Sequence, residues 1–212
     1  MQQLTLALAK GRTAKESLQI LQQANIRFPD FHPDSRKLIF EDETKKIRML
    51  YVKAVDVTTY VEAGAADIGI VGRDNILESG ANIYEMLDLQ IGTCAFIVAG
   101  MSPKPIHTYS SIKVASKYPN VASAYFDQHN IPVETITLNG SVELAPLIHM
   151  ADVVVDIVET GTTIKENGLT ILERLDSIST RLIVNKASFA TKTACIQQLI
   201  TAIDHVLPKE GK

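Results

Sequence analysis

One stretch of the chain combines the residue types that could bind a phosphate and stabilise a cation. Val153–Val155 predicts a buried strand, and acidic Asp156 and Glu159 follow it. The run Thr160-Gly161-Thr162-Thr163 then leads into a predicted helix, whose first backbone N–H groups have no partner within the helix and suit an anion. An ordinary helix cap is the alternative, but acids beside a buried strand are costly unless they contact a ligand, a cation or good donors.

A phosphate-binding loop beside acids is what a phosphoribosyl donor requires. The 5'-phosphate needs N–H donors, and the two ribose hydroxyls need carboxylate acceptors. C1 of the ribose becomes cationic as pyrophosphate leaves, as in glycoside hydrolysis, and a nearby carboxylate stabilises that charge. We therefore take Asp156 and Glu143 as candidates for the ribose.

Basic residues follow the first predicted strand and recur further along the chain. Lys10-Gly11-Arg12 places two cations around a glycine at a strand end, which would suit the phosphates of a nucleotide. Arg36, Lys37 and Lys53 could join them in a cluster that binds a triphosphate or a departing pyrophosphate. Each cation taken singly is more often a solvated surface charge.

Two further strand ends carry weaker signals. Gly72 ends a predicted strand and is followed closely by Asp74, which fits a close approach of ligand to backbone or simply a tight turn. Lys117 and Tyr118 follow a later strand, and the tyrosine offers either a stacking surface for adenine or an ordinary packing side chain.

Composition excludes several classes of protein. The net charge of -3 over 212 residues argues against a general nucleic-acid or membrane-surface binder. Cys94 and Cys195 have no metal-like spacing, so two reduced cysteines are favoured over a single disulfide. No histidine lies at metal-ligand spacing, so we expect no metal site made by protein alone. The start of the chain does not resemble a signal peptide and no apolar run is of spanning length, which predicts a cytoplasmic protein.

Predicted strands and helices alternate along the chain, which indicates an α/β fold with largely parallel strands. Asp56 is expected to cap a helix over Val57–Ala63. The amphipathic helix near the end of the chain could pack back on the first lobe, giving two lobes with a cleft between them. The expected lobes are residues 1–95 with 178–212 on the nucleotide side, and residues 96–177 around the phosphoribosyl pyrophosphate. The remaining predicted elements are strands at 4–9, 38–40, 47–52, 67–71, 94–99, 112–115 and 181–184, and a helix at 13–24.

Five stretches in this order resemble the ATP phosphoribosyltransferase family, and the resemblance covers nearly the whole chain. It implies a fold like that of the two-lobed type II periplasmic binding proteins. It also implies Mg²⁺ bound with the diphosphate, and attack by N1 of ATP on C1 of the ribose. The stretches are Leu6-Ala7-Leu8-Ala9-Lys10-Gly11-Arg12, Asp34-Ser35-Arg36-Lys37-Leu38-Ile39, Tyr60 through Gly72, Leu138-Asn139-Gly140-Ser141-Val142-Glu143-Leu144-Ala145-Pro146, and Asp156-Ile157-Val158-Glu159-Thr160-Gly161-Thr162-Thr163.

The resemblance also implies roles for particular residues. Glu159 to Thr163 would hold the donor's 5'-phosphate, with Glu143 and Asp156 at its ribose. The cations Lys10, Arg12, Arg36 and Lys53 would contact nucleotide phosphates or pyrophosphate, and Lys10 counts among the catalytic candidates with Asp156 and Glu143. Gly11, Gly72, Asp74, Lys117 and Tyr118 complete the expected nucleotide side. The sequence departs from the family in Ala9, which replaces a frequent proline, in Lys53, where arginine is expected, and in Thr58-Thr59, which replaces Pro-Thr.

The sequence stops soon after its last predicted helix, so we expect no histidine-binding regulatory domain in this chain. The resemblance is therefore to the short form, which implies a separate regulatory subunit similar to histidyl-tRNA synthetase and a homodimer within a hetero-oligomer. Two alternatives stay open: a two-lobed binding protein without catalysis, and a phosphoribosyltransferase that acts on a free base. The second commonly has two adjacent acids before the loop, whereas two apolar residues separate Asp156 from Glu159.

Overall fold

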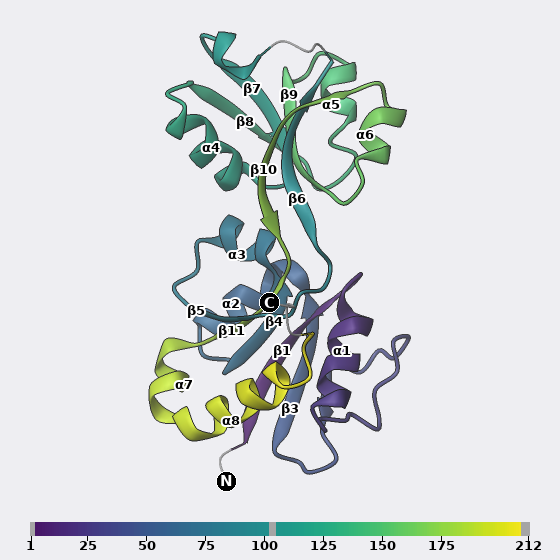
Figure 1. Ribbon diagram of the computed structural model, residues 1–212, viewed down its shortest axis with the longest axis vertical. Coiled ribbons are helices and arrows are strands. Elements are labelled where there is room, and N and C mark those ends of the chain that lie inside the picture. The colour runs from purple at the N-terminus through teal and green to yellow at the C-terminus, as the bar shows by residue number, and fades with distance from the viewer. Residues whose placement is uncertain (1–2, 102–104, 209–212) are drawn as a thin grey trace. The chain divides into compact units, whose positions relative to one another are not determined.

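The computed structural model describes residues 3–101 and 105–208 (Figure 1). The chain divides into two compact units. Unit 1 comprises Met1–Gly92 and Ser179–Lys212, and unit 2 comprises Thr93–Ile178. The chain therefore passes from one unit to the other twice, after Gly92 and after Ile178.

Unit 1 is built on a six-stranded mixed sheet in the order β2-β3-β1-β4-β11-β5. Its centre consists of three parallel strands, with β1 between β3 and β4. The outer strands β2, β11 and β5 run antiparallel to their neighbours. The strands are β1 (Leu4–Lys10), β2 (Ile39–Glu41), β3 (Ile47–Lys53), β4 (Ile68–Gly72), β5 (Tyr84–Asp88) and β11 (Thr180–Val184).

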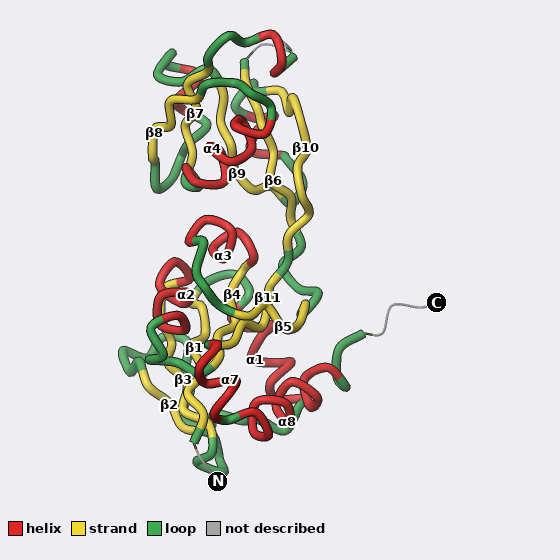
Figure 2. The backbone as a smooth tube through the Cα atoms, turned by 90° about the vertical axis from the view of Figure 1, so that its left-hand side faces the viewer, coloured by secondary structure: helices red, strands yellow, loops and turns green. Residues whose placement is uncertain are grey.

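Helices cover both faces of this sheet, as Figure 2 also shows. Leu6 and Leu8 of β1 share a buried cluster with residues of α1 (Ala14–Gln23) and α8 (Thr193–Asp204). Ala7 and Ala9 point to the opposite face, where they pack with α2 (Ala54–Glu62). Because both faces are covered, β1 is apolar along nearly its whole length. The remaining helices of the unit are α3 (Arg73–Ser79) and α7 (Lys186–Thr191).

Unit 2 repeats this arrangement with a five-stranded sheet in the order β10-β6-β9-β7-β8. Strands β9, β7 and β8 are parallel, and β6 and β10 are antiparallel to their neighbours. The helix α4 (Pro119–Gln128) packs on one face, and α5 (Leu144–Leu147) and α6 (Thr162–Glu166) pack on the other. The strands are β6 (Cys94–Gly100), β7 (Ile112–Ser116), β8 (Val133–Thr137), β9 (Val153–Val158) and β10 (Thr170–Ile178), and Ile106–Thr108 forms a short 3₁₀ turn, η1.

The structure corrects two expectations from the sequence. Among the described residues, four strand pairs are parallel and five are antiparallel, so the prediction of largely parallel strands was wrong. An apolar run indicates a buried strand but not its direction. The helix α2 begins at Ala54, so Asp56 lies in its first turn and is not its cap.

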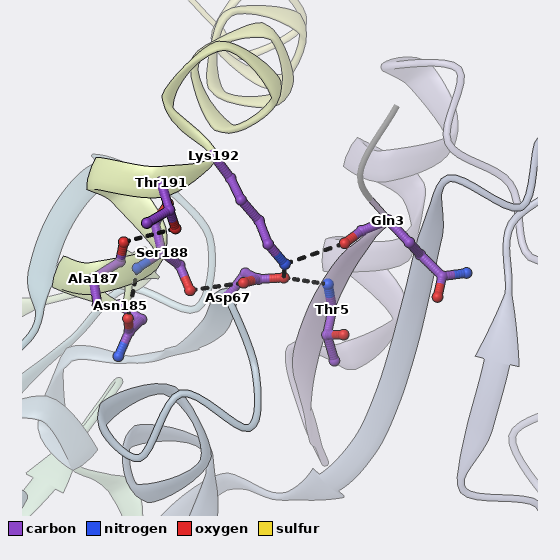
Figure 3. A network of polar contacts seen from close by, with 8 residues as sticks. All are labelled: Gln3, Thr5, Asp67, Asn185, Ala187, Ser188, Thr191 and Lys192. Carbon is purple, nitrogen blue, oxygen red and sulfur yellow. Dashed lines mark hydrogen bonds and ion pairs between the residues drawn. The ribbon is translucent and has the colours of Figure 1, made fainter.

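The buried carboxylate of Asp67 lies at the amino ends of β1 and β4 and joins β1 to the segment around α7 and the start of α8 (Figure 3). Asp67 accepts hydrogen bonds from the Thr5 backbone N–H at 2.8 Å and from Ser188 Oγ at 2.7 Å. Lys192 Nζ lies 2.8 Å from Asp67 Oδ2 and also donates to the carbonyl oxygen of Gln3 at 3.2 Å. The network therefore fastens α7 and the start of α8 to the central strands of the sheet.

Both cysteines are free, as expected, with Cys94 buried and Cys195 half-buried. Within the described part of the chain, no helix is both long and apolar enough to cross a membrane.

Candidate active site

In unit 1 the carboxyl ends of β3, β1 and β4 meet at one edge of the sheet, because these strands are parallel. The register places Lys10 at the end of β1 directly opposite Lys53 at the end of β3. Both lysines are exposed. The structure thus brings together two of the cations that the sequence had separated by more than forty residues.

A cluster of aromatic rings lies beneath these cations. Tyr51 precedes Lys53 by two residues, so it shares a face of the sheet with Lys10 and lies diagonally across from it. Lys10 Nζ is 5.1 Å from the centre of the Tyr51 ring, a cation–π geometry. Phe31 contacts the rings of both Tyr51 and Phe40, each at 5.1 Å. Lys37 Nζ lies 5.3 Å over the ring of Phe40, so this cluster supports cations from two separate segments.

Tyr51 was not among the residues expected from the sequence, although its position two residues before Lys53 was a usable signal. Burial raises the pKa of its phenol, which keeps the ring neutral beneath Lys10. Arg36 is exposed on the loop that also carries Lys37.

The loop between β1 and α1 contains Gly11 and Arg12, and both are exposed. Gly11 has φ of +119°, a conformation that glycine adopts easily and other residues rarely do. Arg12 Nη2 donates a hydrogen bond to the carbonyl oxygen of Gly92 at 3.3 Å. The guanidinium is therefore held by a backbone turn near the point where the chain leaves unit 1.

Gly72, at the end of β4, lies close to the side chain of Asp74. A Cβ on Gly72 would come closer than 3.0 Å to Oδ1 of Asp74. The Asp74 carboxylate is buried and accepts a hydrogen bond from Asn75 Nδ2 at 2.9 Å. This geometry favours a role for Gly72 and Asp74 in shaping the start of α3.

In unit 2 the carboxyl ends of the parallel strands β9, β7 and β8 also meet at one edge. Asp156 lies in the last half of β9, is half-buried, and accepts a hydrogen bond from the Ile157 N–H at 2.8 Å. Glu143 immediately precedes α5, which follows β8 in the chain, and is also half-buried. Asp156 therefore lies on β9, and Glu143 follows β8, with β7 between these two strands in the sheet.

The threonine-rich loop after β9 has the form of an anion-binding loop. Gly161 has φ of +79° and immediately precedes α6, whose first helical hydrogen bond runs from the Lys165 N–H to the Gly161 carbonyl at 3.2 Å. The N–H groups at the start of such a turn have no partner within the helix. Thr160 Oγ1 and Thr162 Oγ1 are 2.9 Å apart and exposed, as are Glu159 and Thr163.

The fourth predicted segment follows β7, where Tyr118 is only 2% exposed. Its ring packs edge-on against Phe96 at 5.1 Å, and Lys117 Nζ lies 5.4 Å from its centre. A buried ring offers no open face to adenine, so the structure favours the packing role for Tyr118. Lys117 is exposed beside it.

Among residues 3–101 and 105–208, the structure contains no group of three or more histidine, cysteine or acidic side chains that could hold a metal ion.

Comparison with known proteins identifies the family. The HisG family model, described as ATP phosphoribosyltransferase, matches residues 53–205. An ATP phosphoribosyltransferase of Oceanobacillus iheyensis is 52% identical over 207 residues, which cover 98% of this chain and 100% of that protein.

Solved structures agree with this match. An ATP phosphoribosyl transferase (HisG:HisZ) complex from Thermotoga maritima contains a chain that is 32% identical, with a TM-score of 0.83 over 96% of this chain and 97% of that one. The periplasmic aliphatic sulphonate binding protein SsuA of Escherichia coli is 14% identical with a TM-score of 0.57, over 97% and 72% of the two chains, and shows the fold alone. The chain has the fold of the periplasmic binding proteins and belongs to the ATP phosphoribosyltransferase family.

Proposed function

We propose that the chain transfers the 5-phosphoribosyl group from phosphoribosyl pyrophosphate to N1 of ATP, with Mg²⁺. The products are phosphoribosyl-ATP and pyrophosphate, and the reaction is the first step of histidine biosynthesis. The observation that carries the proposal is the edge of unit 2 where the parallel strands β9, β7 and β8 end: Asp156 lies in β9, the threonine loop follows β9, and Glu143 follows β8. Family membership gives the reaction, and this geometry supports the assignment of residues to it.

The loop from Glu159 to Thr163 is assigned to the donor's 5'-phosphate. Its exposed threonine hydroxyls contact each other at 2.9 Å and could turn to donate to phosphate oxygens instead. The N–H groups at the start of α6 would add donors; that of Thr162 now donates to Thr160 Oγ1 at 3.4 Å. Gly161 adopts the left-handed conformation that precedes the helix.

Asp156 and Glu143 are assigned to the ribose. Their carboxylates would accept hydrogen bonds from the two hydroxyls of the sugar. As the bond from C1 to pyrophosphate breaks, positive charge develops on the ring, and a half-buried carboxylate stabilises that charge more than it stabilises the neutral ground state. No side chain needs to remove a proton from N1 of ATP, because this nitrogen attacks with its lone pair.

The cations of unit 1 are assigned to polyphosphate. Lys10 and Lys53 lie opposite each other in the register, Arg12 follows Lys10 on the next loop, and Arg36 lies on the loop beside the aromatic cluster. A triphosphate or a pyrophosphate group carries enough negative charge to offset several such cations. When bound, Mg²⁺ would neutralise charge on the diphosphate, whose oxygens would serve among its ligands.

We further propose a regulatory partner related to HisZ, a homodimer of this chain within the resulting hetero-oligomer, and action in the cytoplasm. The support for the partner is the likeness to a chain from a HisG:HisZ complex. The alternative of binding without turnover is favoured only by the fold shared with a periplasmic binding protein.

The test is a steady-state assay with ATP, phosphoribosyl pyrophosphate and Mg²⁺, which follows the absorbance of phosphoribosyl-ATP. We expect product from the wild-type chain, alone or with the regulatory partner. If phosphoribosyl pyrophosphate binds but no product forms, either with the chain alone or with the regulatory partner present, catalysis is refuted and the chain is a binding protein.

The role of Asp156 is tested in the same assay. Asp156→Asn should lower kcat on the order of a hundredfold, with a far smaller change in the affinity for the donor. Asp152→Asn is the matched control, because Asp152 lies just before the opposite end of the same strand and binds the Lys113 N–H. Equal losses of kcat and of donor affinity in Asp156→Asn would contradict a charge-stabilising role.

A further inference from the structure

Gly92 occupies a turn that contacts the basic loop Lys10–Arg12. It has φ of +63° and is the last residue of unit 1 before the chain enters unit 2. Its carbonyl oxygen accepts the hydrogen bond from Arg12 Nη2. The turn itself is fixed by Thr180, whose N–H donates to the Ile91 carbonyl at 3.0 Å and whose carbonyl accepts from the Leu89 N–H at 2.9 Å.

The space around Gly92 is filled by side chains that leave no room for a methyl group. A Cβ there would lie closer than 3.0 Å to Cγ2 of Thr13 and 3.4 Å from Oγ1 of Thr180. Thr13 is the residue before α1, and its branched side chain has few rotamers in which to escape.

The two sides of this contact differ in how easily they can move. Thr180 is 1% exposed and begins β11, which is paired on one side with β4 and on the other with β5. Gly11 and Arg12 are exposed, and Thr13 is half-buried. A side chain at position 92 would therefore displace the basic loop, while β11 would stay in place.

We propose that Gly92 is a positioning residue for the phosphate-binding cations, and that it sets the position of Lys10–Arg12 by contact with Thr13 and by the hydrogen bond to Arg12. The inference rests on the proposed role of this loop in binding the phosphates of ATP or pyrophosphate. Gly92 itself touches no substrate. Its absence of a side chain lets the loop lie against the turn.

The test compares Gly92→Ala with Gly80→Ala. Gly80 ends α3 with φ of +59°, nearly the same backbone conformation, but a Cβ on it would meet nothing within 4 Å. The two substitutions therefore share the strain of alanine at positive φ and differ only in the collision. We expect Gly92→Ala to raise KM for ATP at least about tenfold, the size of one lost charge-assisted hydrogen bond, and Gly80→Ala to leave it unchanged.

A second substitution separates displacement of the loop from general damage. Thr13→Ser removes Cγ2 and keeps the hydroxyl, so Gly92→Ala in that background should recover most of the lost affinity. The reference is Thr13→Ser alone, and thermal unfolding is measured for every variant. Two results would overturn the inference. One is an equal KM for ATP in Gly92→Ala and Gly80→Ala, and the other is a KM for ATP that Thr13→Ser does not lower in the Gly92→Ala background.

The wild-type assay is run first, so that failure of the proposed function is seen separately. If the wild-type chain makes no product, calorimetric binding of ATP with Mg²⁺ replaces KM as the readout for the same variants. Gly92→Ala should then bind ATP more weakly than Gly80→Ala, and Thr13→Ser should restore most of the affinity. Any other order of the affinities would overturn the inference.

Discussion

Asp67 provides a test of whether the stability of unit 1 can be changed without changing its chemistry. The carboxylate is buried at the amino ends of β1 and β4, whereas Lys10 and Lys53 lie at the carboxyl ends of β1 and β3. The two ends of a seven-residue strand are about 20 Å apart. Asp67→Asn keeps the size and shape of the side chain and removes its charge.

The expected cost follows from three contacts, with the Thr5 N–H, Ser188 Oγ and Lys192 Nζ. A hydrogen bond to a charged group contributes ~1.5–3 kcal/mol and a neutral one ~0.5–1.5 kcal/mol, so each contact should lose about 1 kcal/mol. The Lys192 side chain is 24% exposed, and water recovers part of its share. We therefore expect the free energy of unfolding to fall by about 2 kcal/mol.

The measurement is urea unfolding with activity assayed in parallel. The midpoint should fall at an unchanged m-value, and kcat per folded molecule should stay at the wild-type level. Asp67→Asn combined with Lys192→Gln should cost less than the two single changes together, because they remove the same ion pair. A loss below about 0.5 kcal/mol, or a loss of kcat in the folded protein, would refute the reasoning.

Two further predictions concern Lys53 and Asp42. Lys53→Arg should lower KM for ATP by about 2–5-fold, because a planar guanidinium can contact two phosphate oxygens where an ammonium contacts one. Steady-state kinetics would measure this change, and a raised KM would contradict the prediction. For Asp42, burial raises the pKa, but hydrogen bonds from the Thr44 side chain and from backbone N–H groups including that of Ile47 outweigh it and hold the pKa below its usual 3.8. A lowered folded pKa stabilises the protein above the unfolded pKa, and that stability is lost as the pH falls through the folded pKa. Asp42→Asn should therefore unfold at lower urea than wild type near neutral pH, and the difference should shrink well below pH 3.8; a gap that stays constant with pH would count against this.

Much of the fold could be predicted because most central strands are apolar, and because apolar residues recur at helical spacing in the segments between them. The strand at Leu4–Lys10 and the helix at Thr193–Asp204 are examples. The strand β10 was missed because all its exposed residues are polar or charged and its pairing is interrupted by register shifts, which disrupt the period-two pattern. Strand direction was also misjudged, because β6, β11 and β10 owe their direction to long-range connections that no local pattern reports.

The candidate site shows the same limit in its side chains. Residue types and order were enough to select Lys10, Lys53 and Asp156, because the end of a predicted strand can be located in the sequence. Packing around these residues could not be predicted, since it depends on contacts distant in the chain. For Tyr118 the sequence left stacking on adenine and ordinary packing both open, and its ring packs on Phe96, which is 22 residues away in the sequence. The contact of Gly92 with Thr13 spans an even greater separation.

The distribution of charge between the two units is itself an argument for the proposed chemistry. Like charges directly opposite each other on neighbouring strands are unfavourable, so Lys10 against Lys53 costs stability unless an anion lies near. The Tyr51 ring offsets part of this cost by giving Lys10 an aromatic face to lie on, but it adds no negative charge. Unit 2 has the half-buried acids Asp156 and Glu143 at its corresponding edge, and carboxylates can accept hydrogen bonds from hydroxyl groups. A polyphosphate would offset the charge of the first edge, and a ribose that becomes cationic would interact favourably with the acids of the second, so the proposed reaction of ATP with phosphoribosyl pyrophosphate would supply a ligand for each edge.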